Sequence, residues 1–225
     1  MTEPVETSIE AFSALPVFPT MIWATQLKPE VAERINRTLA GLIGEARVNS
    51  PTIATGGKWQ TDQRLHTIPA LGEFNAVVLG LCRHILKADK IRYQDLCITG
   101  CWANIGPPGS GHRPHAHPNN YISGVYYVSA PPGGNTINFF DPRPQASVMV
   151  PPSEGPAPSR SVSQQMTLDV RPGSLIMFPS WLYHSVDENR GREERISIAF
   201  NVMFTPYVAD MSPPNWAGNL KVTPD

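Results

Sequence analysis

The sequence lacks the features that mark several common classes of protein. Its 225 residues carry 18 Lys and Arg against 19 Asp and Glu, and a net charge of −1 gives no attraction to nucleic acid or to an acidic membrane surface. No hydrophobic run approaches the roughly 18 residues that a membrane span needs. The acidic amino-terminal stretch has neither the basic nor the apolar region of a secretory signal, so we expect a cytoplasmic protein.

Cysteine is also scarce. The chain has three cysteines, Cys82, Cys97 and Cys101. They provide neither a disulfide framework nor a second pair that would complete a zinc knuckle. We therefore expect free thiols.

Proline, by contrast, is abundant. The chain holds 24 prolines, where an average usage of about 5% would give about 11. Because proline lacks the amide hydrogen that a helix interior needs, this density excludes an all-helical bundle and favours short strands joined by turns. Apolar residues make up 41% of the chain, enough for one sizeable core. We expect one domain over residues 1–225, with helical support in 1–92, a jelly-roll core in 93–205 and an irregular tail in 206–225.

Hydrophobic periodicity predicts helices first and strands afterwards. A helix is expected to begin at Pro29, and a second to run from about Ala70 to Ala88. From about Tyr93 the period changes to two, and six strand-like runs follow: DLCITGCWANI, YISGVYYVS, NTINFFD, QMTLDV, SLIMFP and RISIAFNVMF. This order predicts a mainly β fold, an antiparallel double sheet or jelly roll with the helices packed on one sheet. The Pro-rich stretch 142–160 is predicted to form a lid.

Three histidines lie close together in the motif GHRPHAHP, at positions 112, 115 and 117. Alternate residues of an extended segment face the same side, so His115 and His117 can reach one metal ion, for which imidazole is the commonest ligand. His184 follows a strand, a tight turn and a second strand, which would carry it to the same end of the fold. His112 has the opposite parity and is expected to point away from the metal, at the entrance to the site.

Arg195 begins the last strand, and its position predicts a buried anion. Ser197 shares its strand face, whereas the intervening residues are apolar and belong to the core. An arginine that faces a protein interior is unfavourable unless it is paired. The anion is either a protein carboxylate or the carboxylate of a ligand.

Together these motifs resemble one enzyme superfamily. The order His-x-His, a Ser-Gly-Val-Tyr-Tyr strand, a distal histidine and Arg-x-Ser resembles the Fe(II)- and 2-oxoglutarate-dependent oxygenases. The segments PHAHPNNYISGVYYV, FFDPR, RPGSLIMFPSWLYHSV and RISIAFN are similar to a group of short stand-alone oxygenases of that superfamily. The resemblance covers roughly Trp102 to Phe204. It implies a double-stranded β-helix, a jelly-roll or cupin-like barrel with helices on its larger sheet.

The resemblance also implies roles for individual residues. His115 and His184 match the two histidine ligands of Fe(II). Arg195 and Ser197 match the groups that bind the distal carboxylate of 2-oxoglutarate, and Tyr127 matches a phenol that contacts the same cosubstrate. An arginine fork with hydroxyl groups suits a carboxylate and leaves the 2-oxo acid end free to chelate iron.

The sequence departs from the superfamily at the third iron ligand. The usual carboxylate position is occupied by His117, and no Asp or Glu occurs between Asp95 and Asp141. We expect three histidine ligands because the parity is right. Two alternatives stay open: His117 swings out and leaves a position for water or a halide, as in the halogenases of the family, or Asp141 reaches back to the metal.

The first functional expectation is an Fe(II)- and 2-oxoglutarate-dependent dioxygenase that hydroxylates a small amino-acid-like or metabolite substrate and releases succinate and CO₂. Its partners would be dioxygen and that substrate, and the sequence leaves a homodimer open. Candidate substrate contacts are Asn104, His112, Arg143 and Asn201. The alternatives are a three-histidine cupin-type dioxygenase that needs no 2-oxoglutarate, and a non-catalytic metal-binding jelly-roll sensor.

Overall fold

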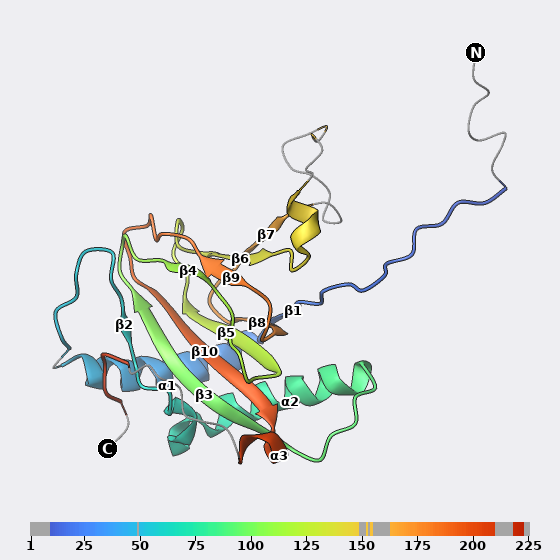
Figure 1. Ribbon diagram of the computed structural model, residues 1–225. Helices are drawn as coiled ribbons and strands as arrows, with labels where there is room; N and C mark the ends of the chain where they lie inside the picture. The colour runs from blue at the N-terminus through green and yellow to red at the C-terminus, as the bar shows by residue number, and fades with distance from the viewer. Residues whose placement is uncertain are drawn as a thin grey trace.

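Two antiparallel β-sheets face each other and form the body of the protein (Figure 1). The computed structural model describes residues 10–48, 50–148, 152, 154, 163–209 and 218–222. The larger sheet has, in spatial order, the strands β1 (Trp23–Gln26), β8 (Ser174–Pro179), β5 (Ile122–Ser129), β10 (Arg195–Phe204), β3 (Leu96–Gly106) and β2 (Trp59–Gln60). The smaller sheet has β4 (His112–His115), β9 (His184–Val186), β6 (Thr136–Phe140) and β7 (Gln165–Asp169).

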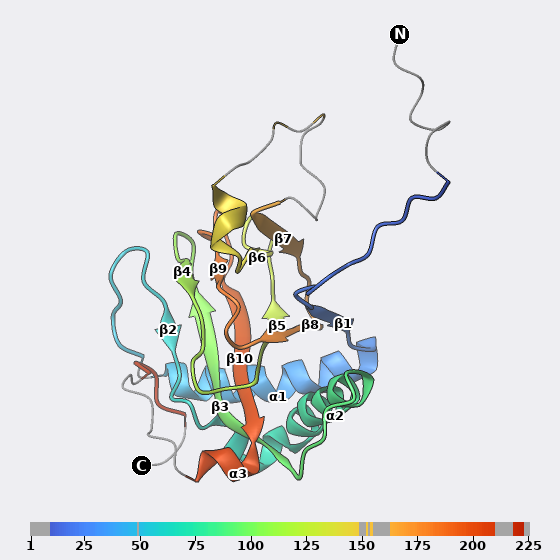
Figure 2. The same cartoon turned by 45° about the vertical axis from the view of Figure 1, so that its right-hand side comes forward.

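Two helices cover the outer face of the larger sheet (Figure 2). They are α1 (Pro29–Arg47), with proline in its first turn, and α2 (Gly72–Ala88). The ring of Phe74 on α2 lies 6.0 Å from Phe200 of β10 and 5.8 Å from Tyr126 of β5. These contacts join the helices and the sheet into one apolar layer. The remaining helical turns are short: Leu65–Thr67, Pro69–Leu71, Pro144–Ser147 and α3 (Thr205–Val208).

The central strand of the larger sheet is β10, which pairs with β3 on one side and with β5 on the other. Ile198 and Phe200 belong to the buried cluster under the helices. Arg195 and Ser197 point the opposite way, into the space between the sheets. The two-residue period of this strand therefore separates the helix-facing core from a polar pocket.

The structure confirms the predicted mainly β fold with amino-terminal helices. The runs predicted as SLIMFP and RISIAFNVMF coincide with β8 and β10. The sheets do not close into the expected barrel, because no strand pairing joins the larger sheet to the smaller one within the described residues. Strands β1 and β2 were not predicted, and they lie in the segment expected to be helical.

Three other expectations have different outcomes. The cysteines are free, as predicted. In the part of the chain that the structure describes, no helix combines the length and apolar composition needed to cross a membrane. Of the predicted Pro-rich lid at 142–160, residues 142–148 are described and include the turn Pro144–Ser147. Most of the remainder lies outside the described residues, so the lid stays a prediction.

Close packing at Gly124 predicts a sensitive position in β5. A Cβ atom at this position would lie 2.7 Å from Cε2 of Phe200 and 2.9 Å from the carbonyl oxygen of Ile176. We expect Gly124→Ala to lower the free energy of unfolding by about 1–3 kcal/mol, the usual cost of overpacking a core. Urea denaturation measures the effect.

Gly80 on α2 provides the matched control, since a Cβ there would meet nothing within 4 Å. Gly80→Ala should leave stability unchanged or raise it by about 0.5–1 kcal/mol, because alanine loses less backbone entropy than glycine in a helix. Equal losses from the two substitutions would contradict the packing described for β5.

Candidate metal centre

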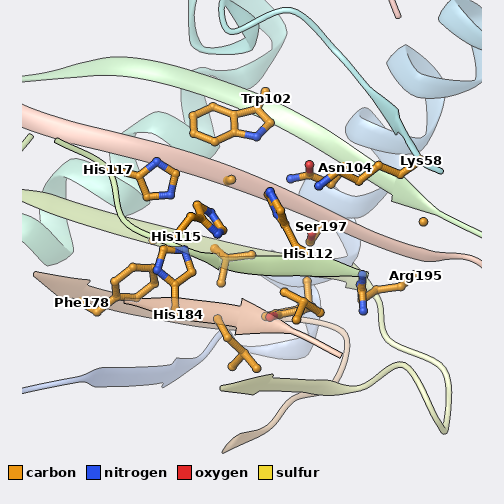
Figure 3. A pocket seen from close by; sticks show the side chains of 17 residues that line it. Lys58, Trp102, Asn104, His112, His115, His117, Phe178, His184, Arg195 and Ser197 are labelled. Atoms are coloured by element: carbon orange, nitrogen blue, oxygen red, sulfur yellow. The ribbon is translucent and has the colours of Figure 1, made fainter. Parts of the chain in front are cut away.

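Three histidines converge at one end of the smaller sheet (Figure 3). His115 ends β4 and is the direct cross-strand partner of His184 at the start of β9, which brings their ring centroids to 4.3 Å. His117 follows β4, where its backbone N–H donates to the carbonyl oxygen of Ser180 at 2.8 Å. Its ring centroid lies 5.0 Å from that of His115 and 5.2 Å from that of His184.

The hydrogen bonds of two of these rings leave the Nε2 nitrogen available to bind a metal. Nδ1 of His115 lies 2.8 Å from the carbonyl oxygen of Arg113, and Nδ1 of His184 lies 3.0 Å from that of Leu182. A carbonyl only accepts, so each Nδ1 carries the proton and each Nε2 offers a lone pair. One ligand atom from each of the three histidines lies within 4.8 Å of the other two. The three rings are therefore arranged as a three-histidine metal site.

Burial keeps these imidazoles neutral. Desolvation, with the neighbouring imidazoles adding to it, lowers the pKa of His117 to about 3 and that of His184 to about 4. The pKa of His115 is also lowered, chiefly by desolvation. Metal ions bind the neutral imidazole, so all three rings are in the ligand form near pH 7.

The position of His112 differs from the expectation. Its ring stacks on that of His115 at a centroid distance of 4.1 Å and lines the same pocket. In the pairing of β4 with β9, His112 lies opposite Val186 and His115 opposite His184, so β4 holds one extra residue. This irregularity reverses the parity, as a bulge does. His112 faces inward, beside the three ligands.

A second group of polar side chains faces the histidines from the larger sheet. Arg195 is only 6% exposed, and within the described part of the chain its guanidinium makes one hydrogen bond, a long 3.4 Å contact with the carbonyl oxygen of Asp187. Among the described residues no carboxylate forms an ion pair with it. The hydroxyl of Tyr127, on β5, is buried without a hydrogen-bond partner, and Ser197 is 6% exposed. The carboxylate of Asp187 attracts Arg195 without forming an ion pair with it. Three donors thus face the pocket from the larger sheet.

These residues fit a metal ion with an anionic co-ligand. The 17 side chains that line the pocket include no Asp or Glu. Three neutral imidazoles would leave the full charge of a divalent ion uncompensated, and the unpaired Arg195 adds another cation. Imidazole nitrogens suit Fe(II), and an arginine fork beside two hydroxyls suits a carboxylate.

The other predicted substrate contacts are distributed unevenly. Asn104 lines the pocket and accepts a hydrogen bond from Nε2 of Gln60 at 3.0 Å. Asn201 is buried, but its Oδ1 accepts from the hydroxyl of Ser123 at 2.7 Å and it does not line the pocket. Arg143 lies in a different groove, in a salt bridge of 2.7 Å with Asp141. This groove also holds Asp141, away from the histidines.

Two pocket residues were missed in the sequence analysis. Lys58 lies between the two helices, in a stretch for which no strand was predicted, and only the pairing of β2 with β3 brings it to the pocket. Nothing in the local sequence distinguishes it from a surface lysine. Trp102 lies 5.7 Å from His117 between ring centroids. It could have been found, because it shares strand parity with Asn104.

The comparison with protein families gives a match over the segment that contains this site. Residues 100–201 match the family described as "Putative 2OG-Fe(II) oxygenase". The match includes all three histidines, Arg195 and Ser197. It confirms the resemblance inferred from the motifs, including the cofactors, Fe(II) and 2-oxoglutarate. A search of curated proteins found no match.

Solved structures of oxygenases share the fold. A prolyl-4-hydroxylase from Pseudomonas putida is 17% identical, with a TM-score of 0.55 over 82% of this chain and 93% of its own. The α-ketoglutarate-dependent carbocyclase SnoK of nogalamycin biosynthesis is 10% identical, with a TM-score of 0.58 over 89% and 91%. HygX from Streptomyces hygroscopicus, solved with nickel and 2-oxoglutarate, is 11% identical, with a TM-score of 0.54 over 83% of each chain.

Removing His117 tests the three-histidine arrangement. We expect His117→Ala to weaken Fe(II) binding roughly 100-fold or more, since the loss of a group that only hydrogen-bonds to a metal ligand already lowers metal affinity about 10–100-fold. Anaerobic competition with a chelator measures the affinity. His84→Ala, an exposed histidine on α2, is the control and should change nothing. Unchanged iron binding in His117→Ala would support the two-histidine alternative.

The lowered histidine pKa values predict how the stability of the metal-free protein depends on pH. The pKa of His117 is about 3 in the folded protein, against an ordinary value of 6.5 for a solvated histidine, so the unfolded chain binds more protons between these values. The free energy of unfolding should therefore fall as the pH is lowered from about 6.5 towards 3.

Urea denaturation at several pH values, on wild type and His117→Gln, measures this effect. The variant lacks one titrating imidazole and should show a shallower fall. Parallel curves for the two proteins would show that His117 is not held in a desolvating environment.

Proposed function

We propose, from the match of residues 100–201 to the 2OG-Fe(II) oxygenase family, that the protein hydroxylates a small amino-acid-like or metabolite substrate. Dioxygen and 2-oxoglutarate would be consumed, with release of succinate and CO₂. Hydroxylation is the simplest outcome of the oxidation of an unactivated C–H bond by this cofactor pair.

The observation that carries the proposal is the unpaired Arg195 next to the histidines. A buried guanidinium without a carboxylate partner is unfavourable in the protein alone. With Tyr127 and Ser197 it offers donors only, so the complementary ligand is a carboxylate. A 2-oxo acid with a second carboxylate satisfies Arg195 at one end and the metal at the other.

Each group would contribute a different part of the chemistry. Fe(II), with 2-oxoglutarate and dioxygen bound, supplies the oxidising power for C–H hydroxylation. His115, His117 and His184 would hold the iron, and the carbonyl acceptors on two of the rings fix their orientation. Arg195, with Tyr127 and Ser197, would orient the cosubstrate by its distal carboxylate.

Apolar side chains form the wall behind the metal site and keep water away from it. Phe178 lies 4.5 Å and Phe139 6.3 Å from the ring of His184, measured between centroids. Both belong to the buried cluster between the sheets. A dry wall strengthens the electrostatic interactions of the site and limits side reactions of the oxidant.

The two alternatives differ in the role of the anion site. A three-histidine dioxygenase without 2-oxoglutarate, or a metal sensor, would have no use for an arginine that lacks a partner in the folded protein. The donors around Arg195 therefore favour the 2-oxoglutarate-dependent reaction over both alternatives.

The direct test is spectroscopic. Anaerobic protein with Fe(II) should develop a visible metal-to-ligand charge-transfer band when 2-oxoglutarate is added, and succinate should form when air is admitted. Arg195→Leu should weaken 2-oxoglutarate binding roughly 30-fold or more, as expected when one partner of a buried charge pair is removed, and should keep iron. Absence of both the band and succinate in the wild type would contradict the proposal.

The neighbouring tyrosines of β5 provide a matched pair. Tyr127→Phe removes the unpartnered hydroxyl beside Arg195 and should weaken 2-oxoglutarate binding about tenfold or more, because the acceptor is charged. Tyr126 points to the helices, where its hydroxyl donates to Asn36 at 2.8 Å. Tyr126→Phe should instead cost about 1 kcal/mol of stability. Titration of each variant with 2-oxoglutarate, followed by the charge-transfer band, compares their affinities. Equal affinities for Tyr127→Phe and Tyr126→Phe would show that Tyr127 does not contact the cosubstrate.

A further inference from the structure

Lys58 is a second cation in the pocket, besides Arg195. Arg195 begins β10, whereas Lys58 directly precedes β2. Its side chain lines the same pocket as Asn104, and both are labelled in Figure 3. It belongs to none of the four ion pairs formed among the described residues. Lys58 lies on the segment that leads into β2, which the family match at residues 100–201 does not include.

The segment that carries Lys58 is firmly attached to the rest of the fold. Trp59 pairs with Ile105 of β3, and its indole N–H donates to the carbonyl oxygen of Pro51 at 2.8 Å. The guanidinium of Arg47 lies 4.7 Å from the centroid of the same ring. The carbonyl of Lys58 itself accepts from Nδ2 of Asn219 at 3.1 Å. The lysine is therefore held at the pocket by the contacts of Trp59 and by the hydrogen bond to its own carbonyl.

Asn104 adds a hydrogen-bond donor next to this cation. Its Oδ1 accepts from Nε2 of Gln60 at 3.0 Å, which fixes the orientation of the amide. Its NH₂ group has no acceptor among the described residues and is available to the pocket. An ammonium and an amide NH₂ that line the same pocket both donate, and two donors suit an anion.

The charges of the pocket remain unbalanced after the cosubstrate is counted. Fe(II), Arg195 and Lys58 are all positive, and the described residues that line the pocket include no Asp or Glu. The dianion 2-oxoglutarate would place one carboxylate on the iron and the other at Arg195. The charge of Lys58 is then without a counterpart. Burial, followed by repulsion from Arg195, lowers the pKa of Lys58 to about 8, as expected for a cation that lacks a partner.

We propose that Lys58 and Asn104 form a second anion subsite, distinct from that at Arg195, which binds a carboxylate of the primary substrate. This inference rests on the proposed function, since the cosubstrate must occupy the Arg195 site. Lys58 acts as a positioning residue: it holds the substrate by its charged end, so that a fixed C–H bond faces the iron. The substrate class is thereby narrowed to carboxylic acids.

Butyrate and its neutral isostere butyramide are suitable probes. Full-length protein is loaded anaerobically with Fe(II) and saturating 2-oxoglutarate, and each probe is titrated by calorimetry. Wild type should bind butyrate and discriminate against butyramide. Lys58→Met should weaken butyrate binding roughly tenfold or more, the cost of losing one charged hydrogen bond. Lys58→Arg should restore part of the affinity, and Lys58→Gln replaces the methionine variant if that variant folds poorly.

The same samples separate the sources of the effect. The 2-oxoglutarate affinity of Lys58→Met, from the charge-transfer band, should stay within about threefold of the wild type, a difference under 1 kcal/mol. Lys87→Met, an exposed lysine at the end of α2, should change neither affinity.

Three results would overturn the subsite: equal butyrate affinities for Lys58→Met and wild type, no preference for butyrate over butyramide, or a loss of 2-oxoglutarate affinity in Lys58→Met as large as in Arg195→Leu. The last result would assign Lys58 to the cosubstrate. Failure of the wild type to form the band would instead contradict the proposed function. Calorimetry needs no band, so butyrate binding to wild type and Lys58→Met is still compared in that case.

Discussion

The alternation of side chains along β10 is the constraint on which both the core and the site depend. The strand is paired on both edges, so its residues can only face the helices or the space between the sheets. Ile198 and Phe200 take the first direction, and Arg195 and Ser197 the second. A shift of one residue in the register would place the arginine in the apolar layer. The packing of the helices therefore also fixes the position of the anion site.

The charge of the pocket links stability to function. Burying Arg195 and Lys58 without carboxylates costs free energy in the unliganded protein, and clustered imidazoles make protonation unfavourable. In the proposed function both costs would be offset by a bound metal and anionic ligands, because each would supply the missing charge. A site of this kind is less stable empty than an apolar core of the same size would be. The absence of acidic residues is thus a property that selects anionic ligands.

The sequence predicted those features that follow from local periodicity. The parity of β10 placed Arg195 and Ser197 on one face, and the spacing of His115 and His117 placed their rings at one site, because each pair lies two residues apart. His112 was placed wrongly, since an extra residue in β4 is visible only in its pairing with β9. Lys58 was missed because its position depends on pairing with a strand 40 or more residues away. Asn201 shares parity with Ser197 but does not line the pocket. The register of β10 with β3 shifts directly after it, and its side-chain Oδ1 accepts a hydrogen bond from the hydroxyl of Ser123.

The most direct test of the central claim is a crystal structure of the anaerobic complex with Fe(II) and 2-oxoglutarate, with the iron located by anomalous scattering. We expect one iron bound by nitrogens of His115, His117 and His184, with the distal carboxylate of 2-oxoglutarate on Arg195. An iron held by only two of these histidines, or a cosubstrate that leaves Arg195 without a carboxylate, would contradict it.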